Sequence, residues 1–200
     1  MSVRAGAGYD ALFIAEALSR FAGGAAAVEL HLFSYLACLV SVYDGRGAED
    51  WLYPFVATLA GAPFAEVLAQ ETDRLRAAGR LLDEGPLLVL SDDGRVELEV
   101  LSSFSSARAH APYLEAACAA ASLLPLPSVA HSVSQEPGLR RALSAEASRE
   151  LLGDAELMLV DEQFGAISEA LADRSGEHRD LLVPTTLWLS YLDASSRQLT

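Results

Sequence analysis

The chain has 200 residues, of which 52% are hydrophobic and 21% charged, and its formal net charge at pH 7 is −14. This composition can fill the core of one domain, or of two small ones, and excludes a disordered chain. The acidic excess disfavours autonomous binding to nucleic acid or to an anionic membrane, because non-specific affinity for either comes from neutralising negative charge.

Nothing in the sequence predicts a membrane segment or a secretion signal. The densest apolar stretch, Val28–Tyr43, is interrupted by polar residues and is too short to cross a bilayer. The N-terminus lacks a charged segment, an apolar segment and a cleavage site in that order. We therefore expect a cytoplasmic protein, in which Cys38 and Cys118 are reduced core residues.

Three helices are predicted before residue 60. Tyr9–Phe21 carries apolar side chains on one side, and Asp10 fits an N-cap or an acid in the first turn. Ala25–Tyr43 is apolar on almost every side, which is typical of a central helix. Ala48–Leu59 predicts a short helix, with Pro54 early enough to be tolerated in its first turn.

The stretch from residue 64 to residue 101 predicts an amphipathic helix followed by a β-hairpin. Apart from Glu71, the residues on one side of the helix are apolar, and Gly79 can close its last turn in the left-handed conformation. An Asp-Gly turn between two β-forming runs is a strong hairpin signal, because a tight turn needs positive φ. Here the turn is Ser91–Gly94, and the runs are Leu87–Leu90 and Val96–Val100.

The remaining residues predict helices separated by polar or proline-containing breaks. The expected helices are His110–Leu124, Gly138–Leu152 and Asp154–Ala172, with an apolar closing segment at Leu181–Leu192. The predicted fold is therefore mainly α with a small β-hairpin. An N-terminal helix occupies residues 1–27, a winged-helix-like unit residues 28–104, and a helical region residues 105–200. A second, degenerate winged helix in the last region is an open alternative.

The sequence holds no phosphate-binding loop, nucleophile elbow or metal-binding motif. Of the four histidines, none has a second His or Cys at metal-ligand spacing, and we expect only His31 to be partly buried, as a hydrogen-bonded structural residue. His178 is expected to be a solvated loop residue. We therefore predict no catalytic residue, no metal ligand and no cofactor.

Adjacent carboxylates also have plainer explanations than acid–base chemistry. Asp92 and Asp93 belong to the predicted hairpin turn, and Glu49 and Asp50 to a helix start. Asp161 and Glu162 lie within one predicted helix, where adjacent residues cannot face the same groove.

Four arginines lie on the predicted third helix and on the hairpin. Arg74, Arg76, Arg80 and Arg95 are interspersed with acids such as Glu71, Asp73 and Glu97. We predict that the helix arginines form ion pairs along the surface, with contact to an acidic partner as the alternative. The acids would oppose DNA phosphates if this helix entered a major groove.

Three segments resemble two related groups of bacterial proteins. They are ELHLFSYLACLVSVYDG at Glu29–Gly45, DWLYPF at Asp50–Phe55, and RLRAAGRLL at Arg74–Leu82. The layout is similar to the middle component of ABC three-component (Lamassu-type) anti-phage systems, and to winged-helix accessory subunits of SMC complexes such as MukE. The resemblance implies a non-enzymatic accessory subunit. It would bind a coiled-coil SMC-like or ABC-type ATPase and couple it to an effector, with the catalytic residues in those partners.

Three functions follow as hypotheses. The first is a protein–protein adaptor, with Trp51, Tyr53 and Trp188 as aromatic anchors beside Arg74, Arg76, Arg80 and Arg95. Core packing is the alternative role for each aromatic residue. The second is a transcriptional regulator that binds DNA as a dimer, which requires folding to gather the arginines into a basic patch. The third is a small enzyme with a site assembled from scattered residues, such as His31 with acids.

Overall fold

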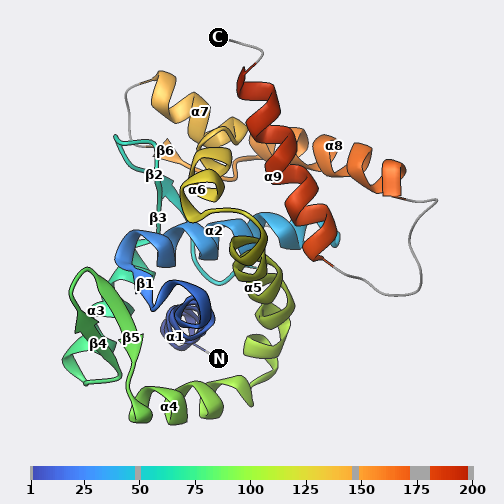
Figure 1. Ribbon diagram of the computed structural model, residues 1–200. Helices are drawn as coiled ribbons and strands as arrows, with labels where there is room; N and C mark the ends of the chain where they lie inside the picture. Colours follow the sequence, from blue (N-terminus) through green and yellow to red (C-terminus); the bar gives the residue numbers. More distant parts are fainter. Residues whose placement is uncertain (1, 48–50, 146–148, 172–180, 198–200) are drawn as a thin grey trace.

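A computed structural model describes residues 2–47, 51–145, 149–171 and 181–197 (Figure 1). Of the described residues, 72% are helical and 9% lie in strands, which form two small sheets. The predicted mainly α class is therefore confirmed.

The chain begins with two long helices joined by a two-residue strand. Helix α1 is Val3–Ala22, strand β1 is Ala25–Ala26, and helix α2 is Ala27–Tyr43. Helix α1 starts earlier than predicted, with Ser2 as its N-cap, so Asp10 is not a capping residue but lies buried in the middle of the helix. The early start brings small residues such as Gly8 into the helix, and these let α1 pack closely against its neighbours.

The third helix leads into a hairpin that pairs with β1. Helix α3 is Glu66–Ala77, and strands β4 (Leu81–Glu84) and β5 (Leu87–Leu90) follow it. Gly79, at φ +68°, ends the helix as predicted. The sheet order is β1-β5-β4, with all pairs antiparallel. Helices α1, α2 and α3 are thus followed by a hairpin whose second strand lies beside β1.

The hairpin lies one element earlier than the sequence pattern indicated. Its turn is Gly85-Pro86, in which glycine supplies a φ of +64°, and residues Asp92–Ser102 form helix α4 instead of the second strand. The Ser91 hydroxyl accepts the Gly94 N–H over 3.0 Å and so caps α4. Serine followed by two acids is also a helix-start signal, and tertiary packing selected it. A Cβ on Gly94 would lie 2.2 Å from the Arg80 carbonyl oxygen, which shows how closely α4 approaches the hairpin.

The predicted helix at Ala48–Leu59 is wrong wherever the structure describes it. Residues 51–55 form bends and irregular backbone, and strand β2 (Val56–Ala57) follows. Strand β2 pairs with β3 (Pro63–Phe64) and with β6 (Arg149–Glu150) in the order β3-β2-β6. Pro54 lacks the N–H that a helix interior needs, which explains why the apolar spacing did not produce a helix. Glu49 and Asp50, predicted to start that helix, lie outside the described residues.

The second half consists mainly of helices: α5 (Ser105–Leu123), α6 (Leu126–Ser134), α7 (Pro137–Ser144), α8 (Asp154–Leu171) and α9 (Leu182–Arg197). The predicted helix at His110–Leu124 is therefore present with shifted ends, and the one at Asp154–Ala172 is present as far as the structure describes it. The apolar closing segment Leu181–Leu192 lies almost entirely in α9. The predicted helix Gly138–Leu152 is only partly correct, because α7 ends at Ser144 and Arg149–Glu150 joins the second sheet as β6.

Helix α2 lies at the centre of the molecule, as its apolar pattern predicted. It packs against α1, α5 and α8, and all its residues from Leu30 to Val42 are buried. Helix α1 is enclosed by α2, α3, α4 and α5, and Figure 1 shows it nearly end-on inside the ring formed by the hairpin, α4 and α5. One hydrophobic core extends from Ala7 in α1 to Leu192 in α9.

No single helix in the described ranges combines the length and apolarity needed to cross a membrane. Helices α5 and α6 together have sufficient length and composition, but the chain bends by 120° between them.

Candidate functional site

Arg74 in α3 and Arg80 just after that helix both donate hydrogen bonds to the carboxylate of Glu97 in α4. Arg74 Nε donates to Glu71 Oε2 over 2.6 Å, and its Nη2 donates to Glu97 Oε1 over 3.1 Å. Arg80 Nε donates to the other oxygen of Glu97 over 3.0 Å. Glu71 is the acid on the apolar side of the predicted helix, and it is only 3% exposed. The hydrogen bond to Glu71 raises the pKa of Arg74.

The remaining arginines of this surface are paired in the same way. Arg76 contacts Asp73 and Asp83, and Arg95 contacts Asp92 and Glu16. The predicted surface ion pairs are therefore confirmed. In this cluster, which we call the arginine–acid surface, five arginines meet seven carboxylates. The residues are Arg4, Arg74, Arg76, Arg80 and Arg95 with Glu16, Glu71, Asp73, Asp83, Asp92, Asp93 and Glu97.

Two charge reversals on α4 should differ sharply in their effect. On the predicted hairpin, Asp92 and Glu97 would both be exposed, and lysine would be tolerated at either position. In the structure the two side chains differ in exposure and in their contacts. Asp92 is fully exposed, whereas the Glu97 side chain is 25% exposed and bonds two arginines. We expect Glu97→Lys to reduce the free energy of unfolding by about 2 kcal/mol, because it places a third cation between Arg74 and Arg80.

Urea unfolding followed by circular dichroism checks this expectation. Asp92→Lys is the matched control, and its unfolding midpoint should stay near that of the wild type. Equal midpoints for the two variants would contradict the role assigned to Glu97.

The three aromatic residues predicted as partner anchors lie inside the protein. Trp51 is 5% exposed, Tyr53 3% and Trp188 fully buried. Trp51 stacks on the His110 ring with the centroids 4.0 Å apart, and Trp188 Nε1 donates to Gln163 Oε1 over 2.9 Å. These side chains therefore pack in the core, which was the alternative role considered for each of them. A partner would have to contact other residues.

Tyr53 belongs to a buried polar network that the sequence did not reveal. The Asp10 carboxylate accepts the Tyr53 hydroxyl over 2.5 Å through Oδ2 and contacts His110 Nδ1 over 3.1 Å through Oδ1. Since Tyr53 donates its only hydrogen to Asp10, the Ser34 hydroxyl, 2.6 Å away, donates to Tyr53. Burial raises the pKa of Tyr53 well above its ordinary value. The network joins α1, α2, α5 and the irregular segment before β2.

The two buried histidines among the described residues, His31 and His110, both have hydrogen-bond partners inside the protein. His31 Nδ1 accepts the Ala65 N–H over 3.1 Å, and its ring lies against Phe64, which confirms the expected hydrogen-bonded structural role. His110 is also buried, at 5% exposure, so the expectation that only His31 would be partly buried is wrong. Cys38 and Cys118 are free and buried, as expected, and burial raises the pKa of both thiols. His178 lies outside the described residues.

The environment of His31 predicts a pH dependence of stability. Burial lowers the pKa of His31 from 6.5 to about 4. The unfolded chain then binds this proton more readily than the folded chain, so stability is full above pH 6.5 and is lost as the pH falls toward 4. We expect His31 to account for a loss of about 2 kcal/mol between pH 7.5 and pH 5. The measurement is urea unfolding at both pH values. The His31→Gln variant should lose less stability than the wild type over this interval, and an equal loss would contradict the assignment.

A second buried acid, Glu136, fixes the start of α7. Its oxygens accept the N–H groups of Gly138 and Leu139, each over 2.9 Å, and Oε2 also accepts the Tyr35 hydroxyl over 3.0 Å. Burial raises the pKa of Glu136 despite these hydrogen bonds. The signal in the sequence was the Glu-Pro-Gly order, since an acid before proline fits a helix N-cap.

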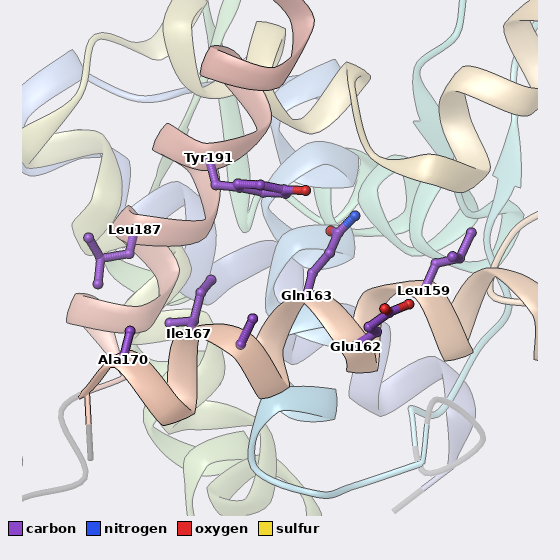
Figure 2. A pocket seen from close by; sticks show the side chains of 8 residues that line it. Leu159, Glu162, Gln163, Ile167, Ala170, Leu187 and Tyr191 are labelled. Atoms are coloured by element: carbon purple, nitrogen blue, oxygen red, sulfur yellow. The ribbon is translucent and has the colours of Figure 1, made fainter. Parts of the chain in front are cut away.

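An open hollow with a volume of about 570 Å³ lies between the last two helices (Figure 2). We call it the α8–α9 groove. Helix α8 lines it with Leu159, Glu162, Gln163, Ala166, Ile167 and Ala170, and α9 contributes Leu187 and Tyr191. Asp161 instead lines a separate hollow beside Arg46 and Met158. The prediction that Asp161 and Glu162 cannot share a groove is confirmed.

Within the described ranges, no group of three or more His, Cys, Asp or Glu side chains is placed to hold a metal ion. In comparisons with known proteins, no family model, no curated protein and no solved structure gives a significant match to this chain.

Proposed function

We propose that this chain is a non-enzymatic adaptor subunit that binds a coiled-coil SMC- or ABC-type ATPase and couples it to an effector in bacterial anti-phage defence. The basis for these partners is the resemblance of the sequence to accessory subunits. The structural observation that carries the adaptor role is the arginine–acid surface, in which the arginines of α3 and α4 are occupied by carboxylates of the same chain.

The proposal includes a winged-helix form for the N-terminal half. Helix α1, strand β1, helices α2 and α3, and the β4–β5 hairpin occur in the order of a winged helix, with the short strands β2 and β3 between α2 and α3. This set of elements starts at Val3 and not at residue 28 as predicted, because residues 51–59 do not form the expected helix. The pairing of β1 with β5 supports this arrangement, because it brings the first strand to the hairpin that would serve as the wing. Helix α3 would then occupy the place of the recognition helix, and α4 would be an addition after the wing.

The arginine–acid surface is the reason to prefer an adaptor to a DNA-binding regulator. A recognition helix contacts phosphates and bases with cationic and polar side chains that are free to leave their own protein. Here Arg74 and Arg80 share Glu97, and seven carboxylates surround five arginines. DNA phosphates would have to displace these acids and then lie beside them, which like-charge repulsion opposes.

The test is affinity capture of the tagged full chain from its native host, read by mass spectrometry, together with fluorescence anisotropy on duplex DNA from its own promoter. We expect stoichiometric recovery of a large ATPase with coiled-coil segments and no DNA binding at micromolar protein. The proposal fails if no such ATPase is recovered while the promoter binds tightly, with an affinity that falls steeply between about 50 and 200 mM salt. In that outcome Arg76→Glu should abolish DNA binding, which would identify α3 as the DNA-contacting helix.

A further inference from the structure

The α8–α9 groove has an apolar floor that is exposed among the residues that the structure describes. Leu187 is 44% exposed and Tyr191 49%, and Leu159 on α8 is also exposed. Figure 2 shows Tyr191 over Gln163, with Leu159 toward one end of α8 and Ala170 toward the other. Side chains of this size normally pack against something, and an exposed apolar groove with polar residues at its edge is typical of an interaction site.

The edge of the groove is acidic. Glu162 lines the groove, and Glu169, two turns further along α8, lies on the same side of that helix. Helix α8 carries five acids and no arginine. Neither Glu162 nor Glu169 forms an ion pair with another residue in the described part of the chain, in contrast to the acids of the arginine–acid surface.

The groove has the dimensions of a short helix. Leu159 and Ala170 lie eleven positions apart on α8, which corresponds to about 16 Å at 1.5 Å per residue, or about three helical turns. Ala166 and Ala170 are small, so a helix could approach α8 closely between the larger side chains at either side. A helix with apolar residues on one face would fill this space in the helix-in-groove manner.

We propose that the α8–α9 groove binds an amphipathic helix of the partner protein, with leucine-type residues on the face that enters the groove and Lys or Arg at its edges. This inference rests on the proposed adaptor function for the existence of such a partner. Charge complementarity favours a basic helix over a second copy of this chain. A symmetric contact through the same groove would bring Glu162 of each copy toward the other acidic helix, in a chain with a net charge of −14.

The first experiment uses three fluorescent peptides of about 20 residues, a length that covers the groove with some excess. One is an amphipathic helix with leucines on one face and Lys and Arg beside them. The second keeps the leucines and replaces the cations by Glu, and the third has the basic composition in scrambled order. We expect the first to bind the full chain at least tenfold more tightly than either of the others.

Leu187→Glu should weaken binding of the basic peptide at least tenfold by placing a charge on the groove floor. The matched control is Leu59→Glu, since Leu59 is an apolar residue that is 73% exposed and lies outside the groove. The double variant Glu162→Arg with Glu169→Arg should reverse the preference from the basic to the acidic amphipathic peptide. Circular dichroism establishes that each variant is folded.

Three outcomes would overturn the proposal. One is the absence of binding by the wild-type chain at about 100 μM basic peptide, a range that includes weak but specific recognition. The second is equal binding by the wild type and Leu187→Glu. The third is a wild-type dimer in sedimentation equilibrium that Leu187→Glu makes monomeric, which would assign the groove to a second copy.

Repeating the affinity capture with Leu187→Glu separates this proposal from the adaptor function. If the variant still recovers the ATPase, the groove is not the docking site but the adaptor role stands. If the wild type binds the peptide through the groove and recovers no ATPase, the groove proposal stands and the adaptor role fails.

Discussion

Replacing Leu36 by aspartate is expected to prevent folding. Leu36 is fully buried near the middle of α2, the helix that packs against α1, α5 and α8. The substitution removes a large apolar side chain and places a carboxyl group where no water or cation can reach it. The loss of packing alone costs about 2–5 kcal/mol, and the buried acid adds several more whether it stays charged or takes up a proton. Domains of this size have a total stability of about 5–15 kcal/mol.

The measurement is a thermal melt by circular dichroism, supported by gel filtration. Leu36→Asp should show no cooperative transition. Val28→Asp is the matched control, because Val28 lies in the first turn of the same helix and is 56% exposed. An acid there also interacts favourably with the helix dipole, so this variant should melt close to the wild type. A cooperative melt of Leu36→Asp at the wild-type temperature would show that α2 is not the central helix.

Replacing Asp10 by alanine is expected to lower the free energy of unfolding by about 3–5 kcal/mol, the usual cost of removing one partner from a buried charged network. The substitution leaves the Tyr53 hydroxyl and His110 Nδ1 without their acceptor. Both groups are buried beneath Trp51 and the neighbouring helices, so water cannot take the place of the carboxylate without opening the core.

Asp10→Asn distinguishes the hydrogen bonds from the charge. The amide oxygen can still accept from Tyr53, and the amide nitrogen can donate to His110 once that ring moves its hydrogen to Nε2. We expect this variant to lose about 1 kcal/mol. Urea unfolding, with an m value that stays unchanged, measures the loss in free energy of unfolding for Asp10→Ala and for Asp10→Asn. A loss of less than about 1 kcal/mol in Asp10→Ala would mean that the network contributes little to stability.

The elements with long periodic patterns could be predicted from the sequence. Apolar residues occur on almost every side of the helix Ala27–Tyr43, which predicted that it is central. The spacing of apolar residues in Asp154–Leu171 predicted an amphipathic helix. Gly79 ended α3 as expected, because few other residues adopt positive φ at low cost. The mixture of arginines and acids on α3 likewise predicted surface ion pairs, since the partners lie within one or two turns or on the next element.

Short segments were ambiguous because one local pattern fits two structures. Ser91–Gly94 serves equally well as a tight turn and as a helix start, and only the packing of α4 against the hairpin selects the second. The segment around Pro54 has helical spacing of its apolar residues, yet its backbone joins a sheet that residue 149 completes. In both places the deciding interactions come from residues that lie outside the segment.

The sequence by itself determined that this is a mainly α, acidic protein with a central apolar helix, in which arginines form ion pairs with acids of the same chain. Those properties depend on composition and on neighbours within a few turns. Only the tertiary structure decided that Asp10 meets His110, 100 positions away, and that Leu187 and Tyr191 of α9 form a groove with α8. Such contacts depend on how helices cross, which is set by the packing of the whole core and leaves no periodic signal in any one segment.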